Sequence, residues 1–182
     1  MPDGELTPLG REQAAKVCEA MKGTGVEYIA ASPLQRGVET AQPLAQTLGL
    51  PIHVWADTYE VRSKGPYTGP TPERMKEMYP ETVCGDDYAA DGWYCSGDET
   101  PETGQARAQR VYDRLCAQFA GKRVALFAHS GFNRHLLLVA LGLPQDSPVY
   151  FHNSNGAIFW LTVTAERTTL NYVGGARVMP NP

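Results

Sequence analysis

One turn with a histidine and another with an arginine carry side chains that could bind phosphate. His129 and Ser130 follow an apolar run at residues 123–128, and Arg36 follows another at residues 26–31. Each run predicts a buried strand that turns directly into a helix, and ligands of open α/β sheets bind at the carboxyl ends of strands. A helix that starts there is expected to offer free backbone N–H groups to an anion. The pattern predicts one phosphate site that contains His129, Ser130 and Arg36.

Each of these residues also has an ordinary structural role open to it. His129 could cap the start of its helix, and a lone arginine such as Arg36 is usually a solvated surface charge. Because both turns favour anions, the phosphate interpretation is stronger for the pair than for either residue alone.

Glu60 is the next candidate, at the point where a short predicted strand at residues 52–55 runs into a segment rich in Gly, Pro, Asp and Tyr. A carboxyl group beside a bound anion holds its proton more readily and could act as a general acid. The alternative is an ordinary loop carboxylate paired with Arg62 or Lys64, which is the better interpretation of Glu60 taken alone.

The elements expected to position these side chains alternate along the chain. Helical spacing of apolar residues predicts helices at residues 8–21, 34–48, 72–78, 101–119 and 133–141. Besides the three strands already given, a terminal hairpin is predicted at residues 157–163 and 168–173. This order predicts an α/β fold, with residues 1–182 as one domain and residues 60–100 as a flap.

The composition is that of an ordinary globular protein. The 182 residues are 42% hydrophobic and 20% charged, with a formal net charge of −4. Without a basic field, nucleic acid and membrane surfaces are not the expected partners. The apolar runs are too short to span a bilayer, and residues 1–5 do not resemble a signal peptide, so a cytoplasmic location is predicted.

The cysteines and histidines predict neither a metal site nor a cofactor. No CxxC pair occurs and the four histidines are scattered. Cys18 and Cys116 fall in helical patterns and are predicted to be core thiols. Cys84 and Cys95 flank an acidic stretch and could form a disulfide, although reduced thiols are the default expectation.

The sequence resembles the histidine phosphatase superfamily, also called phosphoglycerate mutase-like. Residues 6–14 (LTPLGREQA) look like its first-helix signature, and residues 32–41 (SPLQRGVETA) are similar to its Ser-Pro-Leu-x-Arg-Ala-x-x-Thr-Ala motif. Residues 129–131 (HSG) are similar to its second catalytic histidine motif, usually His-Gly-Gly. Two further matches are weaker. Glu60, followed by Gly65 and Gly69, resembles the family's flap segment. Glu102-Thr103, with Arg110 after it, resembles the family's Glu-Ser pair and later arginine.

The resemblance implies a three-layer α/β/α sandwich and a phosphomonoesterase that acts on a small phosphorylated molecule. In the family a histidine attacks phosphorus, a carboxylate protonates the leaving oxygen, and water then releases phosphate. By resemblance, His129 and Arg36 would stabilise the charge on the phosphoryl oxygens, with Ser130 beside them in the substrate-binding turn. Glu60 would be the acid.

One departure from the family pattern bears on activity. The family's nucleophile lies in an Arg-His-Gly motif at the end of its first strand, and no Arg-His-Gly occurs in this sequence. Its absence predicts a truncated domain that binds phosphate but is inactive. Two alternatives stay open: a non-catalytic relative that binds a phosphorylated ligand or a protein, and an enzyme of the same fold with other acid/base chemistry.

The strand that would carry this motif is expected, by resemblance, to lie centrally beside residues 123–128 and near residues 26–31. Backbone N–H and C=O groups that stay unpaired in a sheet cost free energy. The strands at residues 123–128 and 26–31 are therefore predicted to pair directly with each other. Alternatively, another segment or a second chain takes the place of the missing strand. The last case would make a homodimer. The aromatic residues of the flap either line a pocket for a bulky alcohol or, as is commoner, pack on the domain; they are Tyr67, Tyr79, Tyr88, Trp93 and Tyr94.

Overall fold

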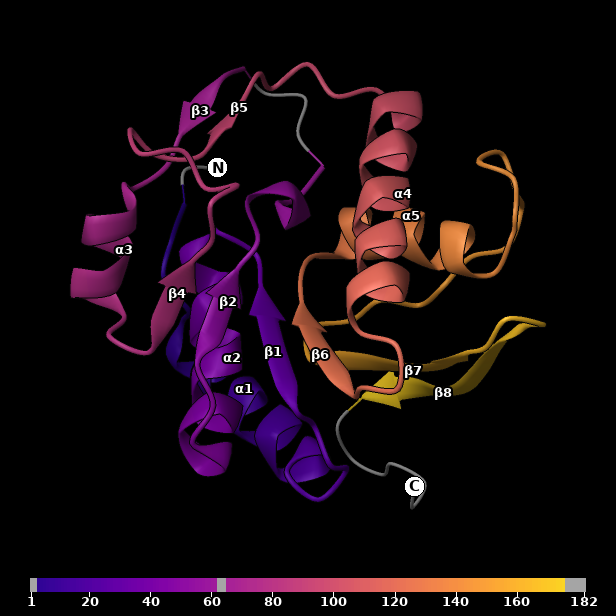
Figure 1. Ribbon diagram of the computed structural model, residues 1–182, viewed down its shortest axis with the longest axis horizontal. Helices are drawn as coiled ribbons and strands as arrows, with labels where there is room; N and C mark the ends of the chain where they lie inside the picture. Colours follow the sequence, from indigo (N-terminus) through magenta and orange to yellow (C-terminus); the bar gives the residue numbers. More distant parts are fainter. Residues whose placement is uncertain (1–2, 62–64, 176–182) are drawn as a thin grey trace.

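A sheet of four parallel strands forms the centre of the protein in the computed structural model, which describes residues 3–61 and 65–175 (Figure 1). The strands pair in the order β4-β2-β1-β6, all in parallel. Their bounds are β1 Tyr28–Ala31, β2 Ile52–Val54, β4 Thr82–Cys84 and β6 Val124–Phe127. Because the strands are parallel, their carboxyl ends meet along one edge of the sheet, where ligands bind in folds of this kind.

Helices cover both faces of the sheet (Figure 1). Alternate residues of β1 point to opposite faces. Ile29 packs in one hydrophobic cluster with buried side chains of helix α2. Ala30 packs in a second cluster, with buried side chains of helices α4 and α5. The helices are α1 Pro8–Met21, α2 Gln35–Leu48, α3 Pro72–Met78, α4 Pro101–Gln118 and α5 Ser130–Ala140. The predicted α/β/α sandwich is confirmed.

Threonine caps define where three of the helices begin. Thr7 accepts a hydrogen bond from the Gly10 N–H at the start of α1, and Thr71 caps α3 in the same way. Thr100 and Thr103 form a reciprocal capping box at the start of α4. Proline follows each cap at the first helical position, where its missing N–H costs nothing. These local signals explain why the predicted helix boundaries agree closely with the observed ones.

Residues 65–100 contain three short strands that the sequence did not predict. Here β3 (Tyr67–Thr68) and β5 (Tyr94–Cys95) form a small antiparallel ribbon, while β4 joins the main sheet beside β2. Among the aromatic residues of this segment, Tyr79, Tyr88 and Trp93 are buried in the main core. These three pack on the domain, which was the commoner of the two alternatives. The flap role of residues 60–100 stays a prediction.

The pairing of β1 with β6 is direct, with Tyr28 opposite Val124 and Ala31 opposite Phe127. Direct pairing of these two strands was one of the outcomes that the sequence predicted. Within the described residues β6 is the last strand of its sheet. Strands β7 (Ala157–Val163) and β8 (Thr168–Gly175) form a separate antiparallel hairpin.

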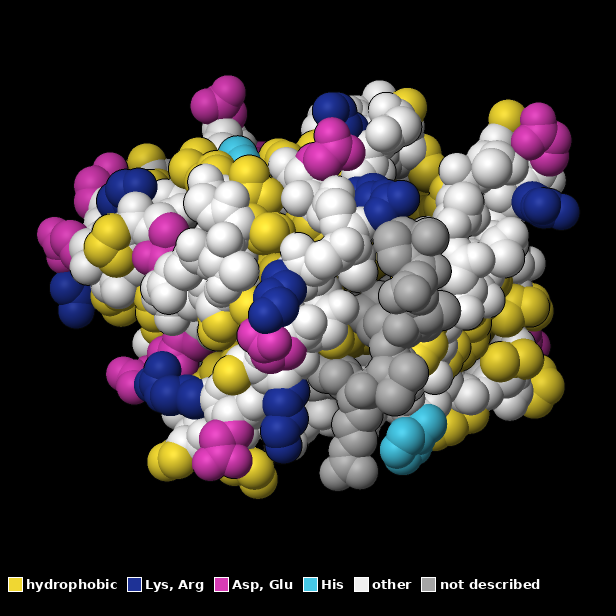
Figure 2. All heavy atoms as spheres, turned by 90° about the horizontal axis from the view of Figure 1, so that it is seen from below, with side chains coloured by type: hydrophobic (Ala, Val, Ile, Leu, Met, Phe, Trp, Pro, Cys, Tyr) yellow, Lys and Arg dark blue, Asp and Glu magenta, His cyan; other side chains and the backbone are white. Residues whose placement is uncertain are grey.

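None of the four cysteines, all of which lie in the described residues, forms a disulfide, so the alternative of a disulfide between Cys84 and Cys95 was wrong. Cys18 is buried as predicted, but Cys116 lies on the exposed side of α4, and its prediction as a core thiol was wrong. Within the described ranges, none of the helices is both long and apolar enough to cross a membrane. Figure 2 shows lysine and arginine side chains interspersed with acidic ones, with no extended patch of one sign on that face.

Candidate functional site

His129 and Ser32 meet where β6 and β1 end. The imidazole Nε2 of His129 lies 2.7 Å from the hydroxyl oxygen of Ser32. Both residues are buried, with Ser32 0% and His129 8% exposed. They come together because β1 and β6 are adjacent and parallel, so the turns that follow them lie side by side.

Arg36 lies in the first turn of α2, directly after Ser32 and its turn, and is half-buried. Burial, together with the positive charges of Arg36 and Arg107, lowers the pKa of His129 to about 3. The structure therefore brings the Arg36 charge within range of His129, and the imidazole is neutral at pH 7. A neutral imidazole can donate one N–H to an anion while Arg36 supplies the charge.

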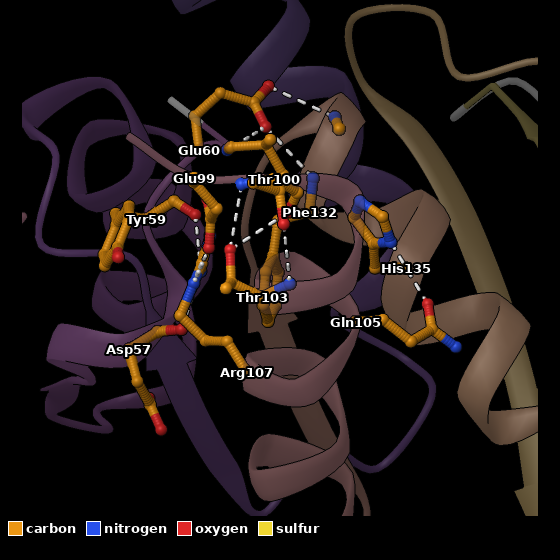
Figure 3. A network of polar contacts seen from close by, with 12 residues as sticks. Asp57, Tyr59, Glu60, Glu99, Thr100, Thr103, Gln105, Arg107, Phe132 and His135 are labelled. Atoms are coloured by element: carbon orange, nitrogen blue, oxygen red, sulfur yellow. Dashed lines mark hydrogen bonds and ion pairs between the residues drawn. The ribbon is translucent and has the colours of Figure 1, made fainter. Parts of the chain in front are cut away.

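Glu60 lies over the start of α5 (Figure 3). Its carboxylate accepts hydrogen bonds from the backbone N–H groups of Gly131 at 3.2 Å and Phe132 at 3.0 Å, and from Val61 at 2.8 Å. The prediction that this helix start offers free N–H groups to phosphate was wrong for Gly131 and Phe132, because the chain's own carboxylate already accepts their hydrogen bonds. The alternative partners of Glu60, residues 62 and 64, lie outside the described residues.

The start of α2 is occupied in the same way, by a residue that the sequence analysis missed. The Asp3 carboxylate accepts the Gln35 N–H at 2.8 Å, and the Ser32 hydroxyl accepts the Leu34 N–H at 3.2 Å. Burial raises the pKa of Asp3. No local pattern links Asp3 to a helix more than thirty residues away, so only the fold could identify it. The Leu34 and Gln35 N–H groups at the start of α2 are therefore not free to bind an anion.

Arg107 is a second residue that the sequence analysis missed, and it is buried. It donates two hydrogen bonds of 2.7 Å to Glu99, and its third nitrogen donates to the carbonyl oxygens of Asp57 and Tyr59, each at 2.9 Å (Figure 3). Its guanidinium also lies 3.8 Å from the centroid of the Tyr59 ring and 4.8 Å from that of Phe132. Arg107 thus fixes the backbone just before Glu60 and ties it to α4 and α5.

This arrangement corrects the match proposed for the start of α4. Glu102 and Arg110 are exposed, and the buried acid–arginine pair is Glu99 with Arg107, three residues earlier in each case. The signal that could have found Arg107 is its place in the buried stripe of α4, which consists of Gly104, Arg107, Ala108 and Val111. An arginine on a core-facing helix stripe needs a buried partner.

Ser130 is the first residue of α5 and is exposed. Its carbonyl oxygen accepts a hydrogen bond of 3.0 Å from the Asn153 side chain. Its hydroxyl has no hydrogen-bond partner within the part of the chain that the structure describes. Ser130 is therefore adjacent in sequence to His129, but its side chain is not part of the Ser32–His129 contact.

Comparisons with known proteins agree with this fold. The model of the histidine phosphatase superfamily, branch 1, matches residues 1–174. A mycobacterial glucosyl-3-phosphoglycerate phosphatase in complex with inorganic phosphate superposes with a TM-score of 0.71 at 24% identity, covering 98% of this chain and 91% of that one. None of the curated proteins compared with the chain matches it.

Two further solved structures are similar. The native structure of the mycobacterial phosphatase has a TM-score of 0.56 at 27% identity, covering 79% of this chain and 71% of that one. A mutant phosphoserine phosphatase of Entamoeba histolytica in complex with phosphoserine has a TM-score of 0.69 at 22% identity, covering 97% and 87%. These neighbours have the same central parallel sheet flanked by helices.

Proposed function

Because the chain belongs to the histidine phosphatase superfamily, we propose that it binds the phosphoryl group of a small phosphorylated molecule at Arg36 and His129, and that residues 1–182 alone do not hydrolyse it. The observation that carries the proposal is the buried contact between His129 and Ser32, with the charge of Arg36 acting on the same imidazole. The similar proteins whose structures contain phosphate or phosphoserine support a small phosphorylated ligand.

Arg36 supplies the attraction in this proposal. A phosphate monoester carries up to two negative charges, and the planar guanidinium matches two of its oxygens. His129 adds a hydrogen bond from a neutral ring, which gives direction without adding charge. Ser130, exposed at the first position of α5, would contact the part of the ligand beyond phosphorus.

The lack of turnover follows from the positions of the histidines. His53 stacks on Tyr28, His135 contacts Gln105 between α4 and α5, and His152 is exposed. None of these three follows an arginine and precedes a glycine as the family's nucleophile does. Without that covalent step, the charge-stabilising groups retain binding but lose most of the rate enhancement.

Glu60 would act as the acid only after a rearrangement. In this structure its two oxygens accept hydrogen bonds from three backbone N–H groups. A proton for a leaving oxygen requires Glu60 to release at least one of these donors. In the unliganded chain, Glu60 therefore stabilises the start of α5. Its role as an acid is confined to the state with ligand bound.

Calorimetric titration with inorganic phosphate, and with phenyl phosphate as a monoester, tests the binding. Removing the guanidinium in Arg36→Met should weaken both ligands at least about tenfold, the loss expected for one charge-assisted contact of roughly 1.5–3 kcal/mol. Arg110→Met is the matched control, because Arg110 is exposed and donates only to a carbonyl oxygen of its own helix. Equal affinity in the Arg36 variant and the control would contradict the proposed site.

Release of nitrophenol from 4-nitrophenyl phosphate tests the absence of turnover. The unmodified chain should show no rate above that of the buffer. A rate that is lost in an identically purified His129→Ala variant would overturn this part of the proposal and leave the binding site in place.

A further inference from the structure

The hydroxyl of Ser32 has two neighbours in the described part of the chain. The Leu34 N–H donates to its oxygen at 3.2 Å, and Nε2 of His129 lies 2.7 Å away. A serine hydroxyl has one hydrogen to donate and two lone pairs to accept with. Since Leu34 can only donate, the Ser32 hydrogen has one acceptor within reach, and that acceptor is Nε2.

The opposite arrangement leaves a buried donor without a partner. If Nε2 carried the imidazole hydrogen, Ser32 would accept from both Leu34 and His129, and its own hydrogen would point at no acceptor. Ser32 is 0% exposed, so water cannot supply the missing acceptor at its surface. Buried hydroxyl groups without a partner are rare because they lose their hydration with no compensation.

The environment of His129 also disfavours an imidazole ring that is protonated on both nitrogens. Burial and the charges of Arg36 and Arg107 lower the pKa of His129, so the ring carries one hydrogen at neutral pH. With Nε2 accepting from Ser32, that hydrogen resides on Nδ1. Within residues 3–61 and 65–175, Nδ1 has no hydrogen-bond partner of its own, so its hydrogen is available to a ligand.

We propose that Ser32 is a positioning residue that fixes His129 in its Nδ1–H tautomer, so that Nδ1–H is the group that donates to a phosphoryl oxygen. The assignment of the tautomer depends on the contacts of Ser32 and on the neutral state of the ring, and it does not depend on the proposed function. The last step, donation to a phosphoryl oxygen, rests on the proposed function. Ser32 does not touch the ligand, and it acts by deciding which ring nitrogen carries the hydrogen.

Long-range ¹H–¹⁵N correlation spectra of the ¹⁵N-labelled chain at pH 7, without phosphate, test the tautomer. The chain has four histidines, and loss of one set of signals in His129→Gln assigns the ring of interest. The expected result is a protonated Nδ1 and an unprotonated Nε2 for His129. A protonated Nε2 overturns the proposal, and this measurement needs no variant of Ser32.

Ser32→Ala tests whether the hydroxyl sets the tautomer. The His129 signals should move towards those of a mixture of the two tautomers, and the affinity for inorganic phosphate should fall about three- to tenfold, in proportion to the share of the competent tautomer. Ser147→Ala is the matched control, because Ser147 is also buried and its hydroxyl accepts a backbone N–H within its own loop. Unchanged His129 signals in Ser32→Ala would overturn the role of Ser32.

The two proposals fail separately. If the wild-type spectrum has the expected tautomer but no phosphate binds, the proposed function is wrong and the role of Ser32 in the tautomer stands. If phosphate binds through Arg36 and Nε2 is protonated, the binding site stands and the positioning role of Ser32 is wrong.

Discussion

Arg107 and Glu99 form a buried ion pair in which both guanidinium–carboxylate hydrogen bonds are 2.7 Å long. The two side chains are only 4% and 7% exposed. The remaining nitrogen of Arg107 holds the backbone that leads into Glu60, so the pair connects α4 with the loop that caps α5 (Figure 3). The position of Glu60 thus depends on a residue that lies outside the Ser32–His129 contact.

Removing the arginine from this pair should be costly. In Arg107→Met a buried carboxylate is left without its main partner and two carbonyl oxygens lose their donor, so the free energy of unfolding should fall by about 3–5 kcal/mol. Urea denaturation followed by circular dichroism measures the change. Arg110→Met, on the same helix but exposed, should change the stability by less than about 0.5 kcal/mol. Similar values for the two variants would contradict the importance of the buried pair.

The stability of the protein should depend on the ionisation of His129. Its pKa in the folded state is about 3, below the ordinary value of 6.5. Between these values the unfolded chain binds a proton that the folded chain does not, so stability is lost as the pH falls from about 6.5 towards 3. The slope contributed by this group is about 1.4 kcal/mol per pH unit, and it vanishes above pH 7.

His129→Gln isolates this contribution. Its side-chain amide can still hydrogen-bond to Ser32 but does not titrate. The difference in unfolding free energy between the wild type and the variant should shift in favour of the variant as the pH falls from 6.5 to 4. A constant difference over that range, measured by urea denaturation at each pH, would show that the imidazole is not kept neutral.

Glu60 should stabilise α5 through its carboxylate. Glu60→Ala removes the acceptor for the N–H groups of Gly131 and Phe132 and should lower the unfolding free energy by about 1–2 kcal/mol, as loss of a helix cap does. Glu60→Gln keeps one side-chain oxygen and should lose less. If alanine and glutamine have the same effect, the contact with α5 does not contribute to stability.

Gly69 lies directly against the Trp93 indole. A Cβ built at position 69 would be only 1.9 Å from the indole nitrogen of Trp93, which is buried. Gly69→Ala should therefore displace the indole and destabilise the fold by roughly 1–3 kcal/mol or more. Gly23→Ala, where nothing lies within 4 Å of the added methyl group, is the control and should be close to neutral.

The sequence by itself determined the local elements of this protein. Thr7 and Thr71, each followed by proline, define helix starts because a side-chain oxygen three residues from an unpaired N–H is sufficient to cap it. The turns after residues 31 and 128 follow in the same way from short apolar runs that end at polar residues. Strand β4, with three residues and no clear alternation, has no comparable local signal and was not predicted.

Only the tertiary structure decided which residues of the site contact one another. Nothing within a few residues of His129 indicates that its partner is Ser32, 97 positions away, because the contact exists only once β1 and β6 pair in parallel. The occupation of the α5 start by Glu60 and the burial of Arg107 in place of Arg110 have the same origin. Hydrogen bonds and ion pairs between distant segments depend on which faces are packed together, and that is a property of the whole fold.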